Sequence, residues 1–170
     1  MRNMIEVIEF AKYAHSGQVR KYTGEPYIVH CAEVAALTAS AKNSTNEMVA
    51  AAWLHDVVED TNYSLWDIEK KFGRQVSDFV YWLTKASKPE DGNRAVRKAI
   101  DCAFLASAPA KVQTIKYADL ISNTGSIATY DPKFARVYMQ EKRKLLAVMN
   151  KGDSFLYQRA RDIVDIYFGD

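Results

Sequence analysis

The feature that most constrains this fold is an apolar run, Met48 to Leu54, which contains no charged residue and leads directly into His55. A helix that is apolar on every face is buried in the middle of a bundle rather than lying on its surface. We therefore predict a central helix that Asn46 caps and that ends at Thr61-Asn62.

The end of this predicted helix carries a cluster of ionisable groups, in the stretch His55-Asp56-Val57-Val58-Glu59-Asp60-Thr61. Such groups at the end of a buried helix are costly unless a metal or partner charges compensate them. Helical spacing brings His55, Asp56 and Glu59 to one side. The alternative is a capped, salt-bridged terminus, but negative charge at a helix C-terminus opposes the macrodipole. The pattern favours a metal site with carboxylates beside it.

Length and composition indicate one ordinary globular domain over residues 1–170, with 48% hydrophobic and 26% charged residues. A formal charge of +2 is too small to indicate a nucleic-acid partner. No apolar stretch approaches membrane-spanning length, and the N-terminus lacks a signal-peptide pattern. Cys31 and Cys102 have no CxxC spacing, which predicts free buried thiols and a cytoplasmic location.

Helical periodicity runs through the chain, and no strand-like alternation interrupts it. We predict an all-α fold of about nine helices. Ser64 to Asp67 is typical of a capping box, and Asp131-Pro132 is typical of an N-cap followed by proline in the first turn. One predicted helix covers Ala110 to Ser122 and ends before Gly125.

Further metal ligands have to come from other helices. His30 stands on an otherwise apolar segment, where a lone histidine is more often a hydrogen-bonded core residue. His15, at a predicted helix end, favours a capping or surface role. Lys116, Asp119 and Asn123 share one helical face, which by itself indicates only polar surface.

Three motifs, in this order and spacing, resemble the metal-dependent phosphohydrolases named for their His-Asp pair: Tyr27-Ile28-Val29-His30, His55 to Thr61, and Lys116-Tyr117-Ala118-Asp119. The Glu-Asp-Thr extension and the loop from Arg20-Lys21 to Pro26-Tyr27 are similar to the alarmone hydrolase domain of Rel/SpoT proteins. The resemblance covers about Ala11 to Asn123 and implies an HD-type helical bundle.

The resemblance implies that one divalent ion, Mn²⁺ in that family, is bound by four ligands: His30, His55, Asp56 and Asp119. Ligand chemistry alone would also suit iron or zinc. It further implies that Glu59 and Asp60 manage an attacking water, and that the substrate is a small nucleotide. The reaction would remove pyrophosphate from the 3′ position of guanosine 5′-diphosphate 3′-diphosphate.

The family's substrate contacts match Arg20, Lys21, Arg97 and Asn123, although without the resemblance Arg20 and Lys21 indicate only a solvated loop. A separate prediction concerns a helical stripe that is apolar except for Glu141: Phe134, Tyr138, Glu141, Leu145 and Val148. We expect Glu141 to face the pocket or to pair with a buried arginine such as Arg97, and Tyr138 to lie near the nucleotide. The alternative is a slightly rotated helix with Glu141 in solvent.

The chain departs from the family pattern at Leu120, where Arg or Lys is usual, at Thr124-Gly125, where an Arg often follows the asparagine, and at Cys31 in place of proline. These departures affect contacts to base and phosphate, so an adenosine alarmone of the pppApp type is an alternative substrate. Two other functions are a nucleotidase of the broader superfamily, which the Glu-Asp-Thr run disfavours, and a non-catalytic nucleotide-binding regulator, which intact Glu59 and Asp60 disfavour.

Overall fold

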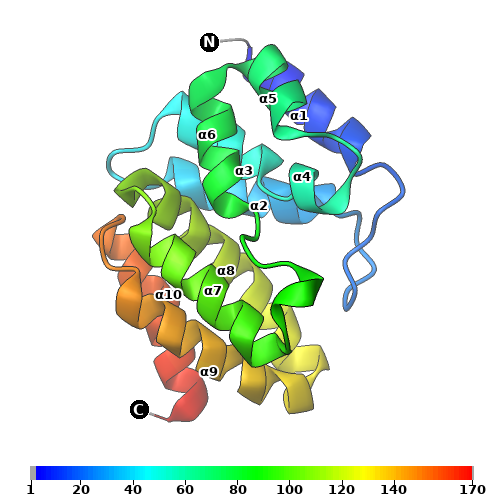
Figure 1. The fold of residues 1–170 in the computed structure, drawn as a ribbon. Coiled ribbons are helices and arrows are strands. Elements are labelled where there is room, and N and C mark those ends of the chain that lie inside the picture. Colours follow the sequence, from blue (N-terminus) through cyan, green and yellow to red (C-terminus); the bar gives the residue numbers. More distant parts are fainter. Residues whose placement is uncertain (1–2, 170) are drawn as a thin grey trace. The chain divides into compact units, whose positions relative to one another are not determined.

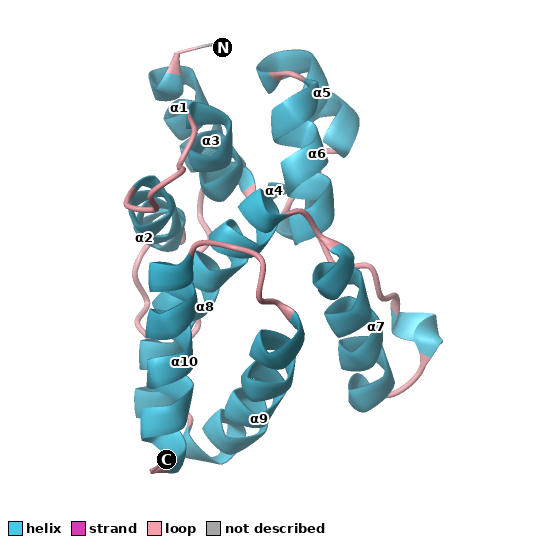
Figure 2. Ribbon diagram, turned by 90° about the vertical axis from the view of Figure 1, so that its left-hand side faces the viewer, coloured by secondary structure: helices cyan, strands magenta, loops and turns pink. Residues whose placement is uncertain are grey.

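A computed structural model describes residues 3–169, and helices and loops make up all of this part apart from one isolated β-bridge between Val19 and Pro26 (Figures 1 and 2). The all-α prediction is confirmed. Ten α-helices and one short 3-10 helix are present in residues 3–169, against about nine predicted. These residues group into two compact units, Met1–Thr84 and Lys85–Asp170. A single domain over residues 1–170 stays a prediction.

The first unit contains six helices: α1 (Met4–Ala14), α2 (Ile28–Ala39), α3 (Asn46–Leu54), α4 (Val57–Asp60), α5 (Leu65–Phe72) and α6 (Arg74–Leu83). Helix α3 is the apolar run, and it packs against α1, α2 and α6. Five of its nine residues are buried: Met48, Ala50, Ala51, Ala52 and Leu54. The predicted buried central helix is therefore confirmed, with Thr45 rather than Asn46 as its N-cap.

The central helix is shorter than predicted, because the chain leaves regular helix at His55 and Asp56 before it forms α4. Asp56 has φ −100° and ψ −2°, outside ideal helical geometry. This break is the reason that the structure contains one more α-helix than the sequence predicted. It also means that His55 and Glu59 do not belong to one continuous helix.

The second unit contains the 3-10 helix η1 (Pro89–Asp91) and four α-helices: α7 (Arg94–Ser107), α8 (Ala110–Tyr130), α9 (Pro132–Val148) and α10 (Ser154–Phe168). Helix α8 packs against α9 and α10, and α7 packs against α9. Asp131 caps α9 through its side chain and Pro132 opens it, as predicted. The capping box of Ser64 and Asp67 in the first unit is confirmed as well.

Helix α8 continues eight residues past its predicted end at Ser122. Glycine inside a helix costs only about 1 kcal/mol, and Gly125 is tolerated here. The hydroxyl of the buried Thr124 is paired within the helix, because it donates to the carbonyl of Leu120 at 2.6 Å.

Two smaller expectations concern the cysteines and the membrane. Cys31 is buried and Cys102 half-buried, and both are free thiols. None of the helices formed by residues 3–169 combines the length with the apolar character that crossing a bilayer requires.

Candidate metal centre

The first unit brings two histidines and a carboxylate together at the C-terminal end of α3. His30 lies on α2, His55 follows the last residue of α3, and Asp56 precedes α4. The two Nε2 atoms are 3.2 Å apart. Asp56 Oδ2 lies 2.9 Å from Nε2 of His55 and 3.7 Å from Nε2 of His30. Atoms that bind one ion at about 2.0–2.2 Å lie on the order of 3 Å from one another, so these three groups fit a shared metal.

The orientation of His55 favours metal binding. Its Nδ1 lies 2.7 Å from the carbonyl oxygen of Ala52, which can only accept a hydrogen bond. In the neutral imidazole the proton is therefore on Nδ1, and the Nε2 lone pair faces His30 and Asp56. Both imidazoles are only 1% exposed. A buried nitrogen lone pair that faces a carboxylate oxygen needs a cation or a proton between them, and a divalent ion meets this need.

Tyr27 orients the carboxylate of this cluster. Its hydroxyl donates to Asp56 Oδ2 at 2.5 Å. The same ring stacks edge-on against His30, with ring centroids 5.5 Å apart. Tyr27 therefore contacts two of the three candidate ligands from the side of the N-terminal loop.

Glu59 and Asp60, the predicted catalytic pair, lie on the single turn of α4 that follows Asp56. Glu59 is half-buried and Asp60 is exposed. Gln18 fixes this turn, because its Nε2 donates to the carbonyl oxygen of Asp60 at 2.7 Å. The other end of the amide contacts Nδ1 of His15 at 2.7 Å.

His15 is the C-cap residue of α1, which agrees with one of its two predicted roles. The surface role is wrong, since the residue is 3% exposed. His15, Gln18 and Asp60 thus form a chain of contacts from the end of α1 to α4. Neither Gln18 nor Tyr27 was assigned a role from the sequence, because their partners lie 42 and 29 residues away along the chain.

The two predicted loop cations differ in environment. Arg20 is 9% exposed and pairs with Glu33 of α2 at 3.2 Å, so the solvated-loop alternative is wrong for this residue. Lys21 is exposed, and its amine lies 3.2 Å from the hydroxyl of Tyr22. The Arg20 guanidinium is thus held in place, whereas Lys21 lies on the surface.

The second unit contains the remaining predicted residues. Asp119 on α8 is 7% exposed, and both of its oxygens have partners on the same helix. Lys116 Nζ lies 2.7 Å from Oδ2, and Asn123 Nδ2 donates to Oδ1 at 2.7 Å. The predicted common face of these three residues is therefore a hydrogen-bonded group. The membership of Asp119 in the metal shell stays a prediction.

Two residues of α9 have shifted pKa values near this group. Burial raises the pKa of Tyr138 above its usual value, and the negative charge of Asp119 raises it further. Burial, together with the positive charge of Lys116, lowers the pKa of Lys142 to about 8. The Lys142 amine lies 4.6 Å from the centre of the Tyr138 ring.

Glu141 pairs with an arginine, but this is Arg94, whose side chain is 46% exposed, rather than a buried arginine such as Arg97. Both guanidinium contacts, from Nε and from one terminal nitrogen of Arg94, measure 2.8 Å. The carboxylate side chain is 18% exposed, so the alternative of a solvent-facing Glu141 is wrong. Arg94 lies one turn before Arg97 on α7. The apolar stripe on α9 could not show which of these two arginines contacts Glu141. Arg97 is half-buried on α7.

Comparison with protein families matches residues 8–149 to the HD domain. Among curated proteins, a guanosine-3′,5′-bis(diphosphate) 3′-pyrophosphohydrolase of Aquifex aeolicus is 33% identical over 139 residues, or 82% of this chain and 18% of its own length. The bifunctional (p)ppGpp synthase/hydrolase SpoT of Escherichia coli K12 is 34% identical over 134 residues, or 77% of this chain and 19% of its own. The chain therefore spans about a fifth of the length of these relatives.

Two solved structures are similar over nearly the whole chain. One is a metazoan ortholog of SpoT that hydrolyzes ppGpp, with a TM-score of 0.85 and 26% identity over 96% of this chain and 94% of that one. The other is the protein lmo0812 of Listeria monocytogenes, with a TM-score of 0.71 and 25% identity over 88% of this chain and 100% of that one.

Proposed function

Because this chain belongs to the HD-domain family, we propose that it is a metal-dependent phosphohydrolase that removes the 3′-pyrophosphate of an alarmone nucleotide of the ppGpp type. The observation that carries the proposal is the convergence of His30, His55 and Asp56 on one point in the first unit. The curated names of the relatives and the activity of the metazoan ortholog supply the reaction.

The donor set suits a divalent transition metal. Two imidazole nitrogens and a carboxylate are compatible with manganese, iron or zinc, and Mn²⁺ is our proposal on the resemblance to Rel/SpoT hydrolases. We propose Asp119 as a fourth ligand on the same basis. When bound, such an ion polarises a phosphoryl oxygen and lowers the pKa of a water molecule. The buried imidazoles keep the donor atoms fixed before the ion arrives.

Glu59 and Asp60 are the proposed groups that accept the proton of the attacking water. They follow the ligand Asp56 by three and four residues, on the one turn that Gln18 fixes through the Asp60 carbonyl. A base in this position removes a proton as the water attacks the pyrophosphate, and a general base contributes on the order of 10²–10⁴-fold in rate. The bond between the 3′ oxygen and its phosphorus breaks, the oxygen of the water stays on the released pyrophosphate, and the 3′ oxygen takes up a proton to become a hydroxyl.

Substrate binding is assigned to cations and polar groups: Arg20, Lys21, Arg97, Asn123 and Tyr138. Cations are needed because both the nucleotide and the metal ligands are negatively charged. The ion pair of the buried Arg20 with the exposed Glu33 would hold its guanidinium in one orientation. The free cysteines favour a reducing compartment, and we propose that the protein acts in the cytoplasm.

Leu120 and Thr124 are both buried, 2% and 1% exposed. Neither supplies the cation that Rel/SpoT hydrolases often carry in this region. With fewer fixed charges to contact the purine and phosphates, we propose that the adenosine alarmone competes with the guanosine form as a substrate.

The deciding experiment measures pyrophosphate and phosphate release, with Mn²⁺, from the guanosine and adenosine alarmones and from simple 5′-monophosphates. We expect pyrophosphate from the alarmones. In Glu59→Ala the rate should fall on the order of 10²–10⁴-fold, while the protein still binds Mn²⁺. Phosphate release from monophosphates alone would replace the proposal with a nucleotidase. Tight nucleotide binding without any product would replace it with a non-catalytic regulator.

A further inference from the structure

Helix α10 has a buried face and an exposed face. On the buried face Leu156, Ala160 and Val164 pack into the second unit, each at most 1% exposed. The exposed face carries Phe155, which is 64% exposed, and Ile166, which is 76% exposed. Single apolar side chains on a protein surface are common, so exposure alone identifies no partner. The spacing and the charges between these two residues carry the information.

Four residues of the exposed face are regularly spaced: Phe155, Arg159, Asp162 and Ile166 follow one another at intervals of four, three and four residues. Alternating steps of four and three place side chains in one narrow stripe along a helix, the pattern through which two helices pack as a coiled coil. All four residues are exposed. We call this stripe the α10 seam.

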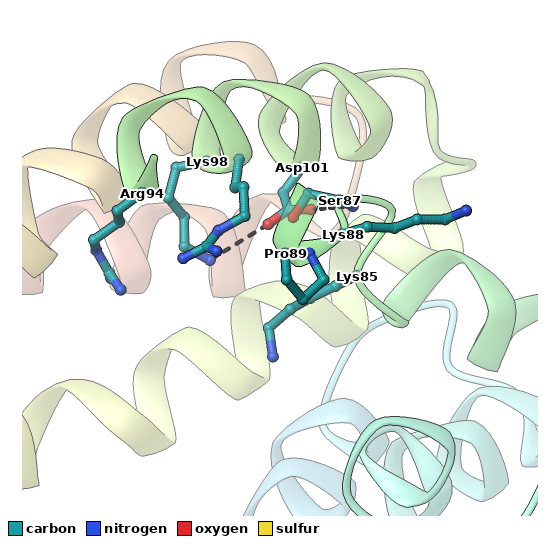
Figure 3. Close-up of a pocket in the computed structure, with 8 residues that line it drawn as sticks. Lys85, Ser87, Lys88, Pro89, Arg94, Lys98 and Asp101 are labelled. Carbon is teal, nitrogen blue, oxygen red and sulfur yellow. Dashed lines mark hydrogen bonds and ion pairs between the residues drawn. The ribbon is translucent and has the colours of Figure 1, made fainter. Parts of the chain in front are cut away.

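Several charged side chains elsewhere in the second unit already have a partner of opposite charge. At the cavity between η1 and α7, Asp101 accepts a hydrogen bond from the backbone N–H of Ser87 and lies 3.4 Å from Lys98 Nζ (Figure 3). On α10 itself, Arg161 pairs with Asp165 at 3.5 Å. Such pairs leave little charge available for a second molecule.

The two charges of the α10 seam differ from these pairs. Within residues 3–169, Arg159 forms no ion pair. Asp162 lies one turn further along the seam, but its Oδ1 accepts from the side-chain amide of Gln158 at 2.7 Å. A guanidinium and a carboxylate therefore lie side by side on an exposed stripe without neutralising each other.

The order of residues makes the α10 seam complementary to itself. The stripe reads apolar, basic, acidic, apolar. When a second α10 lies antiparallel across it, Phe155 faces the partner's Ile166 and Arg159 faces the partner's Asp162. Each of these contacts occurs twice, because a twofold interface repeats every contact. A parallel pair in register would instead place like charges opposite each other, and these repel.

We propose that the α10 seam is a dimer interface on which a second copy of this chain packs with its α10 antiparallel. Charge complementarity selects this occupant, since the seam supplies both members of each ion pair. One helix from each chain covers less than the about 1,200–2,000 Å² of a standard interface, so the dimer exchanges with the monomer. No residue of the seam takes part in the metal centre, and the dimer does not depend on the proposed function.

Sedimentation velocity of the full chain over a range of concentrations measures the dimer directly. The wild type should associate as its concentration rises. Arg159→Glu places two acidic side chains face to face at two points of the interface, and the dissociation constant should rise at least about tenfold. Asp162→Arg should have the same effect, because two basic side chains then face each other.

A mixture of these two variants tests the antiparallel register. When one chain of each kind pairs, the two introduced side chains have opposite charge and face each other. The native Asp162 of one chain and the native Arg159 of the other form the second pair. The equimolar mixture should therefore form a heterodimer about as tightly as the wild type associates, while each variant alone remains weakened.

Arg161→Glu is the matched control. It makes the same change of charge on the same helix, but residues two positions apart do not share a helix face. Its association should match that of the wild type, since Arg161 pairs with Asp165 on its own helix rather than lying in the seam. Thermal unfolding of each variant shows whether the fold is intact.

Four results would overturn the proposal. A wild type that stays monomeric up to about 1 mM has no such interface. A dimer that Arg159→Glu leaves unchanged is held by another surface. An equal loss in Arg161→Glu would show an effect of overall charge rather than of the seam. A mixture of Arg159→Glu and Asp162→Arg that associates no better than either variant alone would exclude the antiparallel pairing.

Discussion

At the scale of single residues, Tyr27 has the clearest testable role. Its hydroxyl donates to the same Asp56 oxygen that faces both imidazoles. Groups that hydrogen-bond a metal-binding carboxylate fix its orientation, and their loss typically costs on the order of 10–100-fold in metal affinity. We therefore expect Tyr27→Phe to bind Mn²⁺ more weakly by about that factor, measured by competition with a chelator.

The control for this prediction is Tyr13→Phe. Tyr13 lies on α1 and is 73% exposed, so the loss of its hydroxyl should leave Mn²⁺ affinity at the wild-type value. A Tyr27→Phe protein that holds Mn²⁺ as tightly as the wild type would show that the hydroxyl has no part in orienting the ligand.

Gln18 tests the positioning of the catalytic turn separately from metal binding. In Gln18→Glu the side chain can still accept from His15 but can no longer donate to the Asp60 carbonyl. A lost hydrogen bond of this kind is worth about 1–3 kcal/mol, so we expect kcat to fall on the order of tenfold or more. Mn²⁺ affinity should stay close to that of the wild type.

Gln75→Glu makes the same chemical change at an exposed position of α6 and should leave kcat unchanged. If Gln18→Glu retains full kcat, or if it loses Mn²⁺ in proportion to activity, the amide does not position the catalytic turn. Steady-state kinetics and chelator competition on the same preparations distinguish these results.

The sequence predicted part of this site because some signals are local. His55 and Asp56 are adjacent and end an apolar run, so their unusual position was visible without a structure. No role was assigned to Tyr27 or Gln18, since a tyrosine or glutamine in a loop has no distinctive pattern. Their roles depend on tertiary contacts that bring the N-terminal loop to α4 and Asp56.

At the scale of helices, two glycines differ in the space around them: Gly152, after α9, has no room for a Cβ atom, whereas Gly125, inside α8, has room. A Cβ atom on Gly152 would lie 2.6 Å from the Tyr117 ring and 2.8 Å from the backbone nitrogen of Thr114. Gly152→Ala should therefore reduce the free energy of unfolding by about 1–3 kcal/mol, as overpacking does. Gly125→Ala is the matched change inside α8, where the added Cβ would meet nothing within 4 Å apart from the adjoining backbone of its own helix.

We expect Gly125→Ala to raise the free energy of unfolding by up to about 1 kcal/mol, because alanine favours the helix more than glycine. Urea denaturation of both variants measures the two values. A stabilised Gly152→Ala would mean that the turn between α9 and α10 can move away from α8. A destabilised Gly125→Ala would mean that α8 is not regular helix at this position.

Helix starts were easier to predict than helix ends in this chain. Ser64 and Asp131 cap their helices through hydrogen bonds to residues three positions away, which a local pattern reveals. The continuation of α8 through Gly125 and the break at Asp56 depend on packing and on the cluster of ligands. Local propensity is a weak guide where tertiary contacts decide.

At the scale of the whole molecule, the metal should act as a stabilising ligand. His30 lies on α2 and His55 directly follows α3, and their buried imidazoles converge with Asp56. A ligand that binds only the folded state stabilises it by about 2.7 kcal/mol at a hundredfold excess over its Kd. Chelation should lower the unfolding temperature of the wild type and have little effect on His55→Ala.

The division of the chain into two units makes Asp119 the most informative residue for a last prediction. The three clustered ligands belong to Met1–Thr84, whereas Asp119 belongs to Lys85–Asp170. If Asp119 is the fourth ligand, Mn²⁺ should slow amide hydrogen exchange in α2, α3 and α4 and also in the middle of α8. In Asp119→Asn the change in α8 should disappear, while protection in α2 to α4 persists with weaker Mn²⁺ affinity. An α8 whose exchange is unaffected by saturating Mn²⁺ in the wild type would remove Asp119 from the ligand set, and the metal would then be bound by the first unit alone.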